Sequence, residues 1–168
     1  MSLKLKVIDN YNEAIRTSEL QLVKDFYCEF GINKTDRFNR TLLLNATLHN
    51  QYELVDWAIK QHADLDHQDR RGMSALHIAV ENNQLNIVSL VLKSGINVDL
   101  QDRFGNTALW RAMMDNVDLD IIYLLLRYRA NPDLKNNYGI SPRELLSDEN
   151  NNWEILKQIF ETSASARN

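Results

Sequence analysis

The sequence predicts an all-α solenoid of about four short repeats, and three observations lead to this prediction. Three of the five glycines, Gly72, Gly105 and Gly139, recur at spacings of 33 and 34 residues. A serine or threonine follows each of them by two residues and can cap a helix there, because its oxygen accepts an otherwise unpaired amide hydrogen. Apolar residues at helical spacing then mark a second helix, as in the run from Leu85 to Leu92. A turn and two helices that recur with this period indicate units that stack on one another.

The composition is that of a soluble globular protein. The chain has 168 residues, of which 44% are hydrophobic, which predicts a single domain with its own core and excludes wholesale disorder. The 19 basic and 23 acidic residues give a net charge of −4, which does not favour general binding to nucleic acid. No apolar run reaches the roughly 18 residues that span a bilayer, so no membrane association is expected. The N-terminus lacks the pattern of a secretory signal, and the single cysteine, Cys28, excludes an intrachain disulfide, so we expect a cytoplasmic protein.

An N-terminal cap unit is expected over residues 11–35. Apolar residues there, such as Leu22 and Val23, match Leu54 and Val55 at a constant offset of 32 residues. The turn that opens the later units is missing, so two helices are predicted over residues 11–30. Terminal units of a solenoid cover a core that has no further neighbour, and for this reason their sequences differ from the inner ones.

Three inner repeats, each with a turn, a short helix, a loop and a second helix, are predicted at residues 36–68, 69–101 and 102–135. In the first of them Asn39 takes the place of the turn glycine, and asparagine tolerates a left-handed backbone best after glycine. Thr41 is the expected N-cap that follows it. Gly31 and Gly95 are expected to close second helices in the left-handed cap, and His62 occupies the same place between them.

The last unit is predicted as a capping repeat over residues 136–161. Its first helix, expected to start from Ser141, is polar where the inner repeats are apolar, which keeps the outer face in water. Pro142 suits the first helical position, since a missing N–H costs nothing there. The tail, residues 162–168, is expected to fray.

Two segments resemble a known family. Ser74-Ala-Leu-His-Ile-Ala79 is similar to the Thr-Pro-Leu-His-x-Ala pattern of ankyrin repeats, and Thr107-Ala-Leu-Trp-Arg-Ala112 follows it well. With the 33-residue period, they make the chain resemble the ankyrin repeat family over residues 36–160. The resemblance implies helix-turn-helix units whose β-turn or hairpin loops project as fingers, and a concave face that binds a partner protein. It also implies that His77 hydrogen-bonds to neighbouring groups and has a structural role.

The candidate binding residues follow from this resemblance and lie in the fingers and late in the first helices. The finger positions are Arg37, Phe38, Arg40, Arg70, Arg71, Met73, Arg103, Phe104, Asn106, Asn137, Tyr138 and Ile140. Five of these twelve are arginine and none is acidic, which predicts a basic, aromatic-rich strip of the kind that dominates binding sites. The expected groove floor adds Leu48, His49, Glu81, Asn82, Met114 and Asp115, with Trp110 and Arg111 one turn earlier. An alternative stays open, in which the arginines pair with the aspartate that leads each turn and the phenylalanines pack on neighbouring fingers.

No motif in the sequence supports catalysis. A phosphate-binding glycine loop, a His-Glu-x-x-His motif and a Gly-x-Ser-x-Gly motif are all absent, so we expect no enzyme, no cofactor, no metal and no small-molecule substrate. His67 with Asp64, Asp66 and Asp69 superficially suggests a metal cluster, but aspartates in an exposed turn usually bond to local backbone. Cys28, without a basic neighbour, is expected to be a buried small hydrophobe.

A protein-binding module is therefore the favoured function. Small bacterial ankyrin repeat proteins include immunity proteins, so the first hypothesis is an inhibitor that neutralises a toxin or effector, with Arg70 or Arg71 near the centre of the contact. An adaptor or scaffold stays open. The alternative is nucleic-acid binding through the arginine-rich finger edge, against which the net charge and the wide spacing of the arginines argue.

Overall fold

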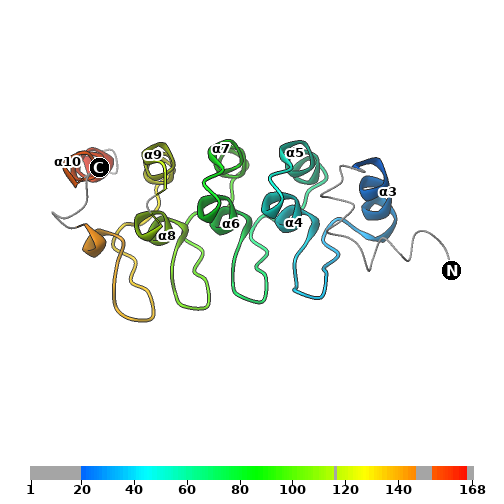
Figure 1. Cartoon of the computed structure of the whole chain (residues 1–168), viewed down its shortest axis with the longest axis horizontal. Coiled ribbons are helices and arrows are strands. Elements are labelled where there is room, and N and C mark those ends of the chain that lie inside the picture. Colours follow the sequence, from blue (N-terminus) through cyan, green and yellow to red (C-terminus); the bar gives the residue numbers. More distant parts are fainter. Residues whose placement is uncertain (1–19, 116, 147–152, 166–168) are drawn as a thin grey trace.

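The chain folds into a row of stacked helical pairs (Figure 1). The structure, a computed structural model, describes residues 20–115, 117–146 and 153–165. First helices of the repeats form one layer and second helices form another, and the loops between successive repeats project as fingers beside the first layer (Figure 1). Every regular element within the described residues is helical. The predicted all-α solenoid is therefore confirmed.

Each inner repeat contributes two helices, which pack against the equivalent helices of the next repeat. The pairs are α4 (Leu42–Leu48) with α5 (Tyr52–Lys60), α6 (Ala75–Glu81) with α7 (Leu85–Lys93), and α8 (Ala108–Met114) with α9 (Leu119–Arg127). Helix α3 (Leu20–Phe30) precedes them, and a short 3-10 helix, η1 (Arg143–Leu145), and helix α10 (Trp153–Ser165) follow. No helix among these described segments has the length and apolarity needed to cross a membrane.

Residues with a left-handed backbone conformation lie at the positions predicted from the sequence. Asn39 has φ +61° in the first finger, and His62 has φ +60° after α5. Gly31 and Gly95 have φ +96° and +90° after α3 and α7. These positions turn the chain out of each element at a place where most side chains are strained.

The predicted N-caps differ in how they bond. The Oγ of Ser74 accepts the backbone N–H of His77 (3.4 Å), and the Oγ1 of Thr107 accepts that of Trp110 (3.1 Å). Thr41 precedes α4 in the same extended backbone conformation, but its side chain forms no capping bond. The expectation that its oxygen caps the helix is therefore wrong, although its position is right.

The core runs through the stack between the two layers. Helices of seven and nine residues are marginal alone in water, so each must bury an apolar face against its neighbours. Leucine, isoleucine and valine side chains supply most of this core, and the fully buried ones include Leu43, Leu54, Leu76, Ile87, Leu109 and Ile121. Since these inward positions hold the repeats together, binding to another molecule has to use the exposed ones.

The end units depart from the predictions at several places. Of the two helices predicted over residues 11–30, one is present as α3, and residues 11–19 lie outside the described residues. Pro142 precedes η1 as its N-cap residue, and three residues of 3-10 helix stand where an α-helix was expected after Ser141. Helix α10 continues to Ser165, and residues 166–168 lie outside the described part, so the fraying of the tail stays a prediction.

Cys28 is exposed, which contradicts the prediction that it is buried. The buried face of α3 consists of Val23, Phe26 and Tyr27. Cys28 lies about 100° around the helix from Tyr27 and still farther from Val23 and Phe26, and it therefore faces the solvent.

Candidate functional site

One polar side chain at the start of each finger holds its turn. The Oδ1 of Asp69 accepts the backbone N–H groups of Arg71 (2.8 Å) and Met73 (3.0 Å). Asp102 binds Phe104 and Asn106 in the same way, at 2.8 and 3.0 Å. Asp36 and Asn136 repeat the arrangement in the first and fourth fingers. Because each carboxylate or amide satisfies two backbone donors, the four turns have one conformation and present equivalent positions in the same direction.

Backbone hydrogen bonds join each finger to the next. The N–H of Arg70 donates to the carbonyl of Phe38 (3.1 Å), that of Arg103 to Arg71 (3.1 Å), and that of Asn137 to Phe104 (3.0 Å). These bonds fix the register between fingers, so side chains that are 33 or 34 residues apart form rows along the stack.

His77 links one repeat to the next from a buried position. Its Nδ1 lies 2.8 Å from the Oγ of Ser74, and its Nε2 lies 3.1 Å from the backbone oxygen of Asn106 in the following finger. A carbonyl oxygen only accepts, so Nε2 carries the proton and donates it, and Nδ1 accepts. Burial lowers the pKa of His77 below its usual 6.5, which keeps the ring neutral. The predicted structural role of His77 is confirmed.

The arginines of the site fall into two groups, and the first group is bound to acidic side chains of the scaffold. Both Arg40 and Arg71 lie near the Oδ2 of Asp69, with Nε–Oδ2 distances of 3.5 and 3.6 Å. Arg111 donates from Nε to the Oδ2 of Asp102 (3.0 Å). Glu81 lies between Arg111 and Arg71, with N–O distances of 3.5 and 4.0 Å. These three arginines therefore belong to an ion-pair network that spans three repeats.

The second group consists of Arg37, Arg70 and Arg103, which we call the arginine column. All three are exposed and occupy the same position in successive fingers. Among the described residues none of them forms an ion pair, and only Arg37 has a ring contact, with the Phe38 ring. The two interpretations of the finger arginines thus apply to different residues, because Arg40 and Arg71 bind the scaffold whereas the three arginines of the column form no ion pair with described residues.

The aromatic residues of the fingers also differ in how far neighbouring side chains cover them. Phe38 is covered by two guanidinium groups, those of Arg37 at 4.8 Å and Arg40 at 5.2 Å from its ring centre. Phe104 and Tyr138 are more exposed, at 54% and 72% of their surface. They occupy the same position in the third and fourth fingers, next to the backbone bond that joins these fingers. The larger free apolar surface therefore lies at the C-terminal half of the row.

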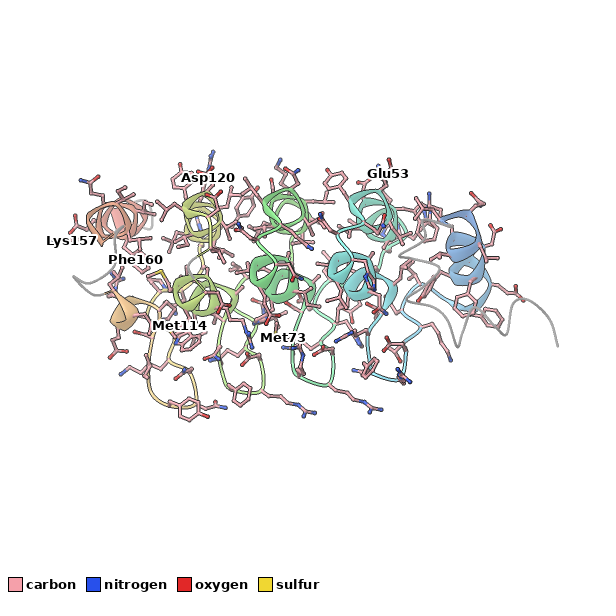
Figure 2. All side chains as sticks on the ribbon, viewed as in Figure 1. Glu53, Met73, Met114, Asp120, Lys157 and Phe160 are labelled. Carbon is pink, nitrogen blue, oxygen red and sulfur yellow. The ribbon has the colours of Figure 1, made fainter. Side chains whose placement is uncertain are left out.

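The prediction that Met73 and Asn106 contact a partner is wrong, because both side chains are buried. Met73 is inaccessible to solvent at the foot of α6 (Figure 2), since the chain returns there to the core one residue before the Ser74 cap. Asn106 is buried in the next repeat, and its Oδ1 accepts the side-chain N–H of Asn136 (2.8 Å). Neither side chain can touch a partner without local unfolding.

The predicted groove floor is partly accessible. Its exposed members are Glu81, Asn82, Met114 and Asp115, and its half-buried members are Leu48, His49, Trp110 and Arg111. Met114, at the end of α8 (Figure 2), is 53% exposed and is the largest free apolar side chain of this set. Sequence reasoning missed that Glu81 joins two arginines, and no motif signals this role, because the link spans neighbouring repeats.

The residues that resemble a metal cluster have separate structural roles. The Oδ1 of Asp64 accepts the N–H of Asp66, and the Oδ1 of Asp66 accepts the N–H of Asn97 in the next repeat. His67 contacts the carbonyl of Asn39 (2.8 Å). Within the described residues, no group of three or more His, Cys, Asp or Glu side chains comes together as a candidate metal site.

Two family models match the chain. The model described as ankyrin repeats (3 copies) matches residues 12–102, which is more than half of the chain. The model described as ankyrin repeat matches residues 104–137. No curated protein matches the chain.

Proposed function

The chain belongs to the ankyrin repeat family, whose repeats are generally protein-binding modules, and from this premise we propose that it binds and inhibits a partner protein through its fingers and first-helix layer. The face consists of the finger tips together with the C-terminal ends of α4, α6 and α8.

The exposed apolar side chains of this face carry the proposal. Phe104, Met114 and Tyr138 each expose more than half of their surface within two neighbouring repeats. Figure 2 shows ring-ended and nitrogen-ended side chains that extend beyond the ribbon at the finger tips. Exposed aromatic and arginine side chains on a rigid support are typical of the residues that contribute most to protein–protein affinity.

The rigidity of the face supports inhibition as the mode of action. Each finger is held by a side chain at its base and by a backbone bond to a neighbouring finger. Ion pairs around Asp69 and Glu81 link the first three repeats in addition. A preorganised face loses little conformational entropy on binding, which favours the slow dissociation that an inhibitor needs. By family resemblance, the partner we propose is a toxin or effector whose functional surface the face covers.

Capture of the partner from the native cell tests the proposal. Immobilised wild-type protein is compared with the F104A/Y138A variant, the retained protein is identified by mass spectrometry and purified, and its affinity is measured by calorimetry. We expect F104A/Y138A to weaken binding by about 2–4 kcal/mol. The partner's own activity is then expected to fall in proportion to the complex formed.

The matched control is Y52A/Y123A. These tyrosines are 48% and 47% exposed, similar in exposure to Phe104, but they lie on α5 and α9 of the second-helix layer. Binding that is lost in the control and kept in F104A/Y138A contradicts the proposed face. A partner that binds but keeps its full activity contradicts inhibition and favours an adaptor.

A further inference from the structure

We propose that the partner presents a row of carboxylates to the arginine column, so that the chain recognises an acidic protein surface. The inference rests on the protein-binding function proposed above and specifies the chemistry of the partner.

The arginine column is uncompensated by the chain's own acidic groups. Three aspartates lead fingers. Asp69 and Asp102 are buried and bind backbone donors together with Arg40, Arg71 and Arg111. Asp36, beside Arg37, is half-buried and accepts backbone N–H groups and the side-chain N–H of Asn45. No ion pair reaches the column within the described residues, although the whole chain has a net charge of −4. Three like charges in one row repel one another, and an acidic partner relieves that repulsion.

The exposed acidic residues are concentrated elsewhere. Figure 2 places Glu53 and Asp120 on the second-helix layer, on the side opposite the fingers. Asp115 is exposed on the groove floor, and Glu81 there is engaged by Arg71 and Arg111. The finger edge is therefore positive, whereas the second-helix layer carries both signs, since Lys93 and Arg127 are exposed there as well. A positive edge orients an acidic partner as it approaches. The partner's carboxylates are expected at the finger edge and not at the floor.

The spacing of the column indicates how these carboxylates are arranged. Packed helices in neighbouring repeats lie about 8–10 Å apart, and the fingers follow this repeat. An extended segment of the polyproline II type has three residues per turn and advances about 3.1 Å per residue, so acidic residues at every third position lie on one face, about 9 Å apart, and match successive arginines. An apolar side chain at the end of such a segment then meets Phe104 and Tyr138.

Selection from a display library tests the inference. The probe is a phage library of random peptides of about twelve residues, which span about 40 Å when extended, selected on the immobilised full chain. The enriched peptides are synthesised and their Kd is measured by fluorescence anisotropy at about 50 mM and about 500 mM NaCl. We expect enrichment of Asp and Glu with a three-residue spacing. The R70E/R103E variant should raise Kd at least about tenfold at low salt, and the difference should shrink at high salt.

The control variant is K93E/R127E, which makes the same charge change at exposed positions of α7 and α9. Its Kd is expected to stay within about twofold of the wild type. Neutral or basic peptides, or equal losses in the two charge variants, overturn the inference.

Comparison with F104A/Y138A separates this inference from the proposed function. Peptides that require Phe104 and Tyr138 but tolerate R70E/R103E leave the binding face intact and refute only the acidic partner. Peptides that tolerate both variants refute the face itself. Retardation of mixed DNA and RNA by the wild type and not by R70E/R103E also overturns the inference, since the column then binds phosphates.

Discussion

The two junctions between inner repeats share one backbone arrangement but use different side chains. In the first junction, between repeats 36–68 and 69–101, Leu44 fills the position that His77 holds in the second, between repeats 69–101 and 102–135. Leu44 is fully buried and apolar, and the Oγ1 of Thr41 beside it has no hydrogen-bond partner among the described residues. His77 instead joins Ser74 to the carbonyl of Asn106. One backbone bond of 3.1 Å links the fingers in both cases.

This difference shows that the spacing of the repeats does not depend on the buried polar link. Apolar packing at the first junction produces the same finger-to-finger bond as the histidine at the second. What the histidine adds is a specific partner in the next repeat and a dependence on pH. The turn residues differ as well. Asn39 has the left-handed backbone in the first finger, and Gly72 has it at the equivalent position of the second finger.

The largest effect is expected at Gly72. A Cβ there would lie 2.7 Å from the backbone nitrogen of Arg103, and its φ of +77° disfavours any side chain. We expect G72A to lower the free energy of unfolding by about 3 kcal/mol, measured by urea denaturation. G139A is the control, since Gly139 has a similar φ of +78° but no atom of the described residues within 4 Å of the added carbon. It should lower the free energy of unfolding by about 1 kcal/mol. Equal losses in the two variants would show that the contact with the next finger is unimportant.

The H77L variant gives the second junction the leucine that the first junction has at the equivalent position. It removes the hydrogen bonds that the ring forms with the N–H of Ser74 and the carbonyl of Asn106. We expect the free energy of unfolding to fall by about 2 kcal/mol at neutral pH. Because burial lowers the pKa of His77 in the folded state, below pH 6.5 the unfolded chain binds a proton that the folded chain does not. The stability of the wild type therefore falls as the pH decreases below 6.5, and H77L should lack this part of the decrease. Parallel pH profiles of the two proteins would refute the role of the ring.

The smallest effect is expected at the two N-caps. S74A removes the oxygen that accepts the N–H of His77 and should cost about 1 kcal/mol. T41V removes a buried hydroxyl without a partner, so it should change stability by less than about 0.5 kcal/mol or raise it. Urea denaturation of both variants measures the difference. A loss in T41V as large as that in S74A would mean that Thr41 is bonded after all.

Much of the fold could be predicted because it depends on local pattern. The left-handed residues at Asn39 and His62 and the cap at Ser74 follow from the residues themselves and their period. The burial of Met73 and Asn106 could not be predicted, because it depends on where the finger rejoins the core. The exposure of Cys28 could not be predicted for a related reason, since tertiary packing decides which face of α3 is buried.

The amino-acid sequence alone determined the period, the order of turns and helices, and the concentration of arginine in the fingers. Only the tertiary structure decided which arginines are engaged, because the acids that bind Arg40 and Arg111 come partly from neighbouring repeats. A repeat pattern specifies what each unit contains, whereas the contacts between units determine which charges remain free. In this chain those contacts leave Arg37, Arg70 and Arg103 exposed along one edge.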